Sequence, residues 1–139
     1  MPYYIVEPEV AGELGPSTVY DRDSRPVSVT HLEYRFTNWL GDALVESTPC
    51  FIATEALAKR ISREALTGVT FEDVTVTLSP EGEELIEEPL PNWRWLKLTG
   101  QPYVSDISLN DDLMLVMSDR ALLIIQEFGL DNAIVEPAD

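Results

Sequence analysis

The chain has 139 residues, and 25 acidic side chains against 9 basic ones give it a formal net charge of -16. This length suits one domain, and a hydrophobic content of 45% is enough for one core, which argues against a disordered chain. A pI near 4.2 argues against direct binding of DNA or RNA, because phosphates would be repelled. No apolar run approaches the ~20 residues of a membrane span. The first residues also lack a signal-peptide pattern, so we expect a cytoplasmic protein with no membrane contact.

The N-terminal segment predicts one strand followed by a long connection. Pro2–Pro8 contains residues that favour strands and is bounded by prolines. Glu9–Pro26 contains two glycines and further prolines, so it predicts little regular structure.

Val27–Thr37 alternates between apolar and polar residues and predicts a second strand. The alternation slips near Thr30–His31, which indicates a bulge. Gly41-Asp42 is typical of a turn, after which Ala43–Glu46 would return as the hairpin partner. The side chains expected to face inward are Val27, Val29, Leu32, Tyr34 and Phe36.

A helix is expected from Glu55 to about Leu66, with Thr54 as its N-cap. Its end is expected at Thr67-Gly68, because glycine tolerates the left-handed conformation after a helix. Glu55 and Lys59 are spaced to form an exposed ion pair. The buried stripe would consist of Leu57, Ile61 and Ala65.

Phe71–Leu78 alternates as a strand whose Val74, Val76 and Leu78 would face inward. Ser79–Asn92 holds four glycine or proline residues and five glutamates, which predicts a surface loop. Trp93–Leu98 alternates again and should pair with the preceding strand, and we interpret Trp93 and Trp95 as core residues.

Leu113–Met117 is apolar on both faces and predicts a buried strand. Ser118 can cap a helix over Asp119–Phe128, which is apolar nearly all round and is therefore expected to be central. Gly129 fits the helix end, and Ala133–Glu136 forms a last strand. The order of elements predicts a single α+β domain over residues 1–139, with a mostly antiparallel sheet and two main helices at about 55–66 and 119–128.

The candidates for enzyme chemistry are sparse. His31 and Cys50 are the single histidine and cysteine, and they lie nineteen positions apart without a local signature, so we predict no catalytic residues and no zinc site. Asp106, Asp111 and Asp112, with Asn110, lie close enough to hold calcium or magnesium. Their spacing does not match an EF-hand loop, so we expect no metal and no cofactor, and a small enzyme or ion-binding module stays as the alternative.

Negative charge gathers in two segments. Such fields attract basic partners, and plain solubility is the alternative explanation of the charge. Trp39, in a turn region, is the candidate for an exposed aromatic anchor. The candidate partner-binding residues are Glu81, Glu83, Glu84, Glu87, Glu88, Asp106, Asp111, Asp112 and Trp39.

Several segments resemble small bacterial proteins in which a strand-to-helix entry and two characteristic helix boundaries recur. The similarity covers roughly residues 34–136. The segments that carry it are Cys50-Phe51-Ile52-Ala53-Thr54-Glu55, Leu66-Thr67-Gly68-Val69-Thr70-Phe71-Glu72-Asp73-Val74, Pro91-Asn92-Trp93-Arg94-Trp95-Leu96, Leu115-Val116-Met117-Ser118-Asp119-Arg120-Ala121-Leu122 and Phe128-Gly129-Leu130.

In these segments the chain is similar to immunity-type proteins of bacterial polymorphic toxin systems, which bind a cognate toxin domain and block it. The matching positions are caps, core residues and helix ends, so the resemblance transfers no toxin-contacting residue. It implies a non-enzymatic binding protein with a basic protein partner. An accessory subunit with a non-toxin partner would have the same sequence features.

Overall fold

The computed structural model describes residues 2–24 and 28–138, which form 13 strands and 3 helices in mostly antiparallel sheets. The expected α+β class is thereby confirmed. In chain order the elements are β1 (Tyr3–Glu7), β2 (Gly12–Leu14), β3 (Val19–Asp21), β4 (Ser28–His31), β5 (Glu33–Phe36), β6 (Leu44–Ser47), β7 (Cys50–Thr54), α1 (Glu55–Arg63), β8 (Val69–Glu72), β9 (Thr75–Leu78), α2 (Pro80–Leu85), β10 (Trp93–Leu98), β11 (Ile107–Leu109), β12 (Leu115–Ser118), α3 (Asp119–Phe128) and β13 (Ile134–Ala138).

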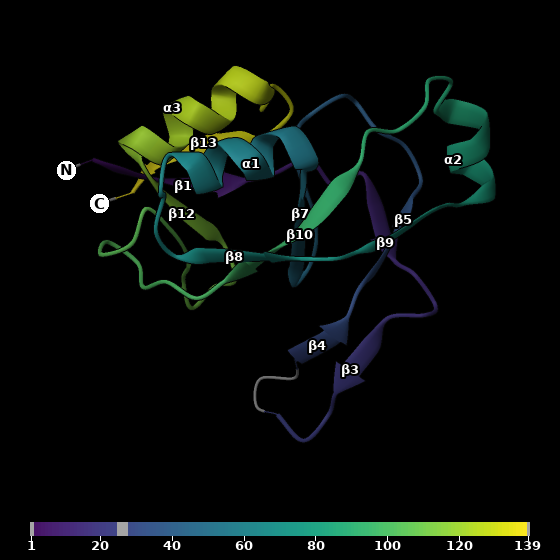
Figure 1. Ribbon diagram of the computed structural model, residues 1–139, viewed down its shortest axis with the longest axis horizontal. Coiled ribbons are helices and arrows are strands. Elements are labelled where there is room, and N and C mark those ends of the chain that lie inside the picture. Colours follow the sequence, from purple (N-terminus) through teal and green to yellow (C-terminus); the bar gives the residue numbers. More distant parts are fainter. Residues whose placement is uncertain (1, 25–27, 139) are drawn as a thin grey trace.

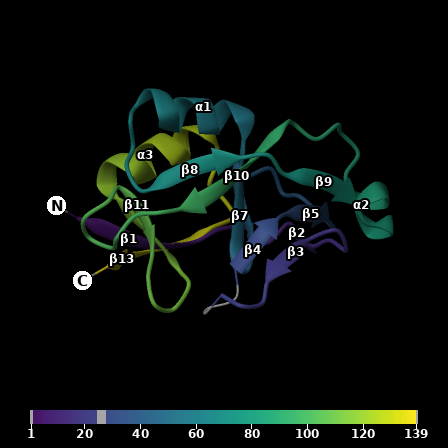
Figure 2. The same cartoon turned by 60° about the horizontal axis from the view of Figure 1, so that its bottom comes forward.

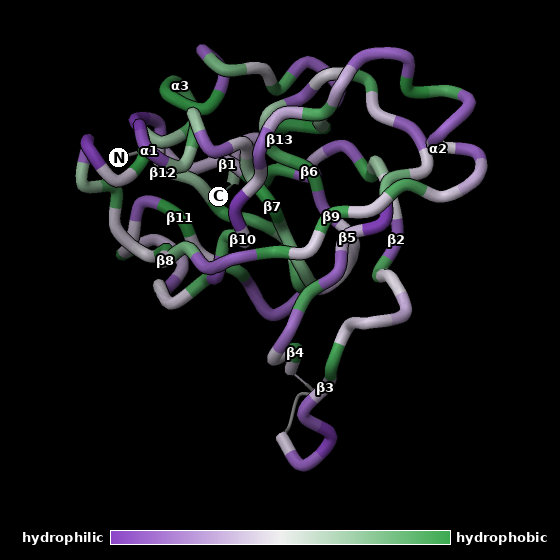
Figure 3. The backbone as a smooth tube through the Cα atoms, turned by 45° about the vertical axis from the view of Figure 1, so that its right-hand side comes forward, coloured by the Kyte–Doolittle hydropathy of each residue, from purple (hydrophilic) through white to green (hydrophobic). Residues whose placement is uncertain are grey.

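The strands form two four-stranded sheets, one three-stranded sheet and a ribbon. The four-stranded sheets have the orders β11-β12-β1-β13 and β6-β7-β10-β8, and the three-stranded sheet has the order β2-β5-β9. β5 and β9 run parallel, whereas the other strand pairs are antiparallel. The ribbon of β3 and β4 projects from the body (Figure 3). Both chain ends lie at one end of the molecule and α2 at the other (Figure 1).

Helices α1 and α3 lie side by side over the four-stranded sheets (Figure 2). Both begin at the predicted caps, because the hydroxyl of Thr54 accepts a hydrogen bond from Leu57 N at 3.2 Å and that of Ser118 accepts from Ala121 N at 3.1 Å. α1 ends at Arg63, three residues before the predicted Leu66. Neither α1 nor any other helix of the described residues is long and apolar enough to cross a membrane.

Two details of the helix predictions were wrong. Ala65 does not extend the buried stripe of Leu57 and Ile61, because the helix has ended and Ala65 is exposed with a φ of 55°. α3 has the predicted bounds but is not central, since Leu123 is 58% exposed. The inner face of α3 covers the sheet, whereas its outer face is solvent-exposed and consists of Arg120, Leu123, Gln126 and Glu127.

The sheet β6-β7-β10-β8 carries the core on both of its faces. Alternate residues of β7 belong to two different apolar clusters, Phe51 and Ala53 to the one under α1 and α3, Cys50 and Ile52 to the other. The second cluster lies between this sheet and β5. It contains Trp93 and Trp95, which are 7% and 5% exposed, so their predicted core position is confirmed.

The connection predicted over Glu9–Pro26 is more regular than expected, because it contains β2 and β3. The strand predicted over Val27–Thr37 is divided into β4 and β5 at Leu32. The bulge is confirmed, since Val19 pairs with His31 and Tyr20 with Val29, which leaves Thr30 as the extra residue. Of the predicted inward-facing residues, Val27 lies outside the described residues, and those found buried are Val29, Leu32, Tyr34 and Phe36.

Two predicted strand arrangements were wrong. The segment at Ala43–Glu46 does not return along the preceding strand, because β6 pairs with β7. Phe71–Leu78 is not one strand: β8 joins β10, and after Asp73 the chain crosses to another sheet, where β9 joins β5. The predicted pairing of β10 with Phe71–Leu78 is confirmed for the part that belongs to β8 and is wrong for β9.

Candidate partner-binding surface

The segment predicted as a loop over Ser79–Asn92 begins with the short helix α2. The hydroxyl of Ser79 accepts a hydrogen bond from Gly82 N at 3.0 Å, and Pro80 occupies the first turn, where a missing N–H costs nothing. Gly82 lies so close to β5 that an added Cβ would come within 2.3 Å of the Phe36 carbonyl oxygen. Ser79 N also donates to this oxygen at 2.9 Å. The end of β5 therefore positions α2.

An open groove of about 680 Å³ runs between β9 and the segment that follows α2. We call it the β9 groove, and its lining consists of Val76, Thr77, Leu78, Glu83, Ile86, Glu87, Glu88, Pro89, Leu90 and Pro91. Leu78 is 38% exposed, and Val76, Ile86 and Leu90 are half-buried. The inward face predicted for this strand is therefore only partly covered, and its apolar side chains form one wall of the groove.

The charge around this groove is of one sign. No lysine or arginine belongs to its lining within the part of the chain that the structure describes. We call the five exposed glutamates of this region the acidic rim, and they are Glu81, Glu83, Glu84, Glu87 and Glu88. Glu83, Glu87 and Glu88 line the groove itself, whereas Glu81 and Glu84 lie beside it on α2.

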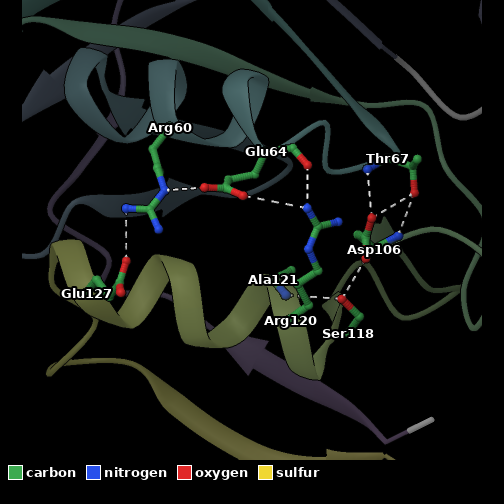
Figure 4. A network of polar contacts seen from close by, with 8 residues as sticks. All are labelled: Arg60, Glu64, Thr67, Asp106, Ser118, Arg120, Ala121 and Glu127. Atoms are coloured by element: carbon green, nitrogen blue, oxygen red, sulfur yellow. Dashed lines mark hydrogen bonds and ion pairs between the residues drawn. The ribbon is translucent and has the colours of Figure 1, made fainter.

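The carboxylate of Asp106 is half-buried, and groups of the protein itself already occupy it (Figure 4). It accepts hydrogen bonds from Thr67 N at 2.9 Å, Thr67 Oγ1 at 3.2 Å and Ser118 Oγ at 2.9 Å. Burial alone would raise the pKa of Asp106, but these hydrogen bonds and nearby Arg120 lower the pKa below the usual value of a free aspartate. Its role in the structure is to tie the end of α1 to the start of α3.

The rest of this polar network joins the two helices directly. Arg60 on α1 pairs with Glu64 at 2.9 Å and with Glu127 on α3 at 3.1 Å, while Arg120 on α3 pairs with Glu64 at 3.7 Å (Figure 4). Two of the few basic side chains are thus used in helix packing.

Asp111 and Asp112 are exposed in the turn between β11 and β12, which lies away from α2 (Figures 1 and 2). The turn is held by the side chain of Asn110, whose Oδ1 accepts from Asp112 N at 2.9 Å and from Met114 N at 3.0 Å. No group of three or more His, Cys, Asp or Glu side chains among the described residues is arranged to hold a metal ion. The fold thus separates these two aspartates from the acidic rim.

Trp39 does not project from the surface as expected. It is half-buried, its Nε1 donates to the carbonyl oxygen of Asp42 at 2.9 Å, and its ring meets that of Trp93 edge to face at 5.6 Å. The indole therefore fixes the turn that follows β5. An aromatic side chain with its polar atom satisfied internally is a poor anchor for a partner.

Cys50 and His31 lie in different environments. Cys50 is buried, and burial raises the pKa of its thiol to about 11. His31 is exposed on β4, where its Nε2 lies 3.3 Å from Thr75 Oγ1. A thiol with so high a pKa is a weak nucleophile at neutral pH.

A buried acidic pair near Trp39, Glu9 and Asp42, was not predicted from the sequence. Glu9 accepts hydrogen bonds from Leu40 N at 2.6 Å and Asp42 N at 3.3 Å, and burial raises its pKa. Asp42, 1% exposed, accepts from Asn132 N and Asn132 Nδ2, both at 2.9 Å. These carboxylates hold backbone N–H groups of two turns, so we assign them to the fold and not to a site.

The β9 groove and its acidic rim combine exposure, a partly apolar lining and a concentration of negative charge. Comparison of the chain with protein-family models, curated proteins and solved structures finds no match.

Proposed function

We propose that the protein is a cytoplasmic, non-enzymatic binding protein of the immunity type, which binds a cognate basic toxin domain through the β9 groove and blocks it. The observation that carries this proposal is the acidic rim, five exposed glutamates around an open, partly apolar groove without a lysine or arginine in its described lining.

The rim and the groove lining would contribute in different ways. A field of one sign accelerates the encounter with a cationic partner and repels nucleic acid, an effect that decreases with ionic strength. Apolar side chains such as Leu78 and Ile86 supply area that becomes buried on binding. A toxin that acts on a polyanion has lysine and arginine in its cleft, and covering them with carboxylates excludes its substrate.

Glu81→Gln, Glu83→Gln, Glu84→Gln, Glu87→Gln and Glu88→Gln together give a rim variant that tests this proposal. The matched control removes five exposed acids that do not line the groove: Glu13, Asp21, Asp23, Asp131 and Glu136, each changed to its amide. The partner is sought by affinity capture from the native host, beginning with the toxin encoded nearest to this gene, and the reconstituted pair is measured by surface plasmon resonance.

The rim variant should bind the toxin domain at least tenfold more weakly, chiefly through a slower association rate, whereas the control variant should retain most of the affinity. A further variant, Asp111→Asn with Asp112→Asn, tests the second acidic segment and should bind as the wild type does. Unchanged affinity of the rim variant, or wild-type affinity that persists at ~1 M salt, would refute the electrostatic part of the proposal. A captured partner without a basic surface would refute the proposal itself.

A further inference from the structure

Strand β9 has a free edge toward the β9 groove. On its other side it pairs in parallel with β5, where Thr75 N donates to Leu32 O at 3.0 Å and Ser79 N donates to Phe36 O at 2.9 Å. Successive residues of a strand direct their N–H and C=O groups to opposite sides, so those of Val76 and Leu78 point away from β5. No strand of the described residues pairs with this edge, and no hydrogen bond within them reaches Val76 N or Leu78 N.

The four-residue edge lacks several of the devices that usually protect exposed edges. Thr75–Leu78 contains no proline, no lysine and no bulge, the devices that prevent another strand from adding. Both Val76 and Leu78 also line the β9 groove, so the unpaired backbone groups and the apolar side chains lie on the same wall.

We propose that the occupant of the β9 groove is an extended, lysine- or arginine-rich segment of the partner, which adds as a strand to the free edge of β9. This inference rests on the proposed function and specifies how the partner binds. Strand addition supplies main-chain hydrogen bonds, and alternate side chains of the added segment enter the groove or face the rim. An alternation of apolar and basic residues matches the apolar wall and the carboxylates.

Charge decides between this occupant and a second copy of the chain. Two β9 edges pairing with each other would bring two acidic rims together, and like charges at close range oppose that arrangement. A basic segment neutralises the same carboxylates. The acidic rim thus opposes pairing between the β9 edges of two copies. It does not oppose the addition of a lysine- or arginine-rich strand to the same edge.

A buried donor next to the groove agrees with this placement. A second hollow, of about 310 Å³, shares Val76 and Pro91 with the β9 groove and is lined by Trp93. Trp93 is 7% exposed, and its Nε1–H has no acceptor among the described residues. A chain laid along β9 would satisfy this buried donor only where one of its backbone carbonyls enters the hollow and reaches Nε1.

The test uses a synthetic nine-residue peptide of alternating lysine and valine with blocked ends, and the full-length protein. Amide hydrogen exchange is followed by NMR with and without saturating peptide. The N–H groups of Val76 and Leu78 should exchange at least tenfold more slowly with peptide, because they become hydrogen-bonded. Binding without such protection would overturn the strand-addition model.

Two matched probes separate hydrogen bonding from charge. The first probe is a pair of peptides of the same sequence, one N-methylated at the odd residues and the other at the even residues. Both keep the charge of the peptide, and one of them loses the N–H groups that would donate to β9. The second is Val76→Pro, a change that an edge strand tolerates where the N–H faces outward. Circular dichroism confirms the fold, and Val76→Ala controls for the lost side chain. Methylation of the peptide N–H groups that face β9 and Val76→Pro should each weaken binding at least tenfold, whereas methylation in the other register and Val76→Ala should each weaken it less than threefold.

The outcomes distinguish this inference from the proposed function. If the toxin domain loses affinity for the rim variant but not for Val76→Pro, the partner binds the charges without adding a strand, and the inference is overturned while the function stands. If the rim variant binds the toxin normally, the electrostatic part of the proposed function fails first. Dimerisation of the free protein that is abolished by Val76→Pro would identify a second copy as the occupant and would also overturn the inference.

Discussion

Glu46→Gln should stabilise the protein at neutral pH, because Glu46 is a half-buried carboxylate that ionises at a cost. Burial, with a smaller effect of Glu7, raises its pKa from 4.5 to about 6. The hydrogen bonds of Glu46 within the described structure use its backbone: its N–H donates to Glu9 O at 2.9 Å and its carbonyl accepts from Tyr34 Oη at 2.8 Å. Glutamine preserves both bonds and removes the charge.

The magnitude follows from the shift in pKa. A change of one unit corresponds to ~1.4 kcal/mol, so the shift of Glu46 sets an upper limit of about 2 kcal/mol. Solvent reaches part of this side chain and screens it, so we expect about 1 kcal/mol. The folded state binds the proton more tightly than the unfolded state, so ionisation destabilises the fold fully above pH 6. The penalty disappears as the pH falls through 6 to below 4.5.

Urea unfolding of wild type and Glu46→Gln at pH 7.5, 5.5 and 4.0 measures this dependence. The variant should gain about 1 kcal/mol at pH 7.5, about 0.6 kcal/mol at pH 5.5, and close to nothing at pH 4.0. Glu13→Gln, an exposed residue of β2, is the control and should change the unfolding free energy little at any of these pH values. A gain of equal size at pH 4.0, or a loss at pH 7.5, would show that the side chain acts through packing and not through its charge.

Gly82→Ala should cost about 1–3 kcal/mol in urea unfolding despite the higher helix propensity of alanine, because its Cβ would meet Phe36 O at 2.3 Å. Equal stability of Gly82→Ala and wild type would mean that α2 can shift away from β5 without loss of stability. Ser118→Ala should cost about 1–2 kcal/mol, since it removes the cap of α3 and a donor to Asp106. Ser118→Asp should not recover this stability: aspartate can cap the helix, but its carboxylate would lie beside that of Asp106 and repel it. Cys50 should react with Ellman's reagent at pH 8 far more slowly in the folded protein than in urea, because burial raises its thiol pKa to about 11. Equal rates would contradict its burial.

The helices could be predicted because their signals are local. Thr54 and Ser118 are followed by residues of helical spacing, and their hydroxyls cap the first turn without help from distant segments. The C-terminal bound of α1 was harder, since Glu64 and Ala65 continue the helical pattern in sequence. Contacts with α3 through Arg120 stabilise the chain where it leaves the helix.

Strand partners could not be predicted from alternation alone. The pattern over Phe71–Leu78 is continuous, yet the chain changes sheets at Asp73, whose carboxylate pairs with Arg94 on β10. Similarly, β6 has the residues of a hairpin partner, and its choice of β7 over β5 depends on packing between the two core clusters. Alternation reports which side chains share a face, not which neighbour they meet.

The candidate site was predicted in part. The glutamates of Ser79–Asn92 are exposed as expected, but the groove beside them depends on β9 leaving the sheet of β10, which no local signal contains. Asp106 was counted with the surface acids because its partners Thr67 and Ser118 are distant in sequence. The feature of the sequence that relates to the groove is the apolar alternation at Val76 and Leu78. This alternation predicts a buried strand face, not the wall of an open groove.

The acidic rim also permits a test of whether its charges serve the fold. Glu81 and Glu83 lie in the first turn of α2, where negative charge is favourable, but Glu84, Glu87 and Glu88 have no basic residue in the last turn to offset them. Repulsion among five carboxylates should therefore balance or exceed the benefit of the first turn. We expect the urea midpoint of the rim variant to be no lower than that of the wild type. The difference between the two midpoints should increase at low salt, because repulsion among the wild-type carboxylates is then screened less. A lower midpoint would mean that the glutamates stabilise α2, and weaker partner binding by that variant would then need a structural explanation. A midpoint that is equal or higher would show that this charge does not serve the stability of α2, which leaves solubility and the proposed recognition of a cationic partner as its physical explanations.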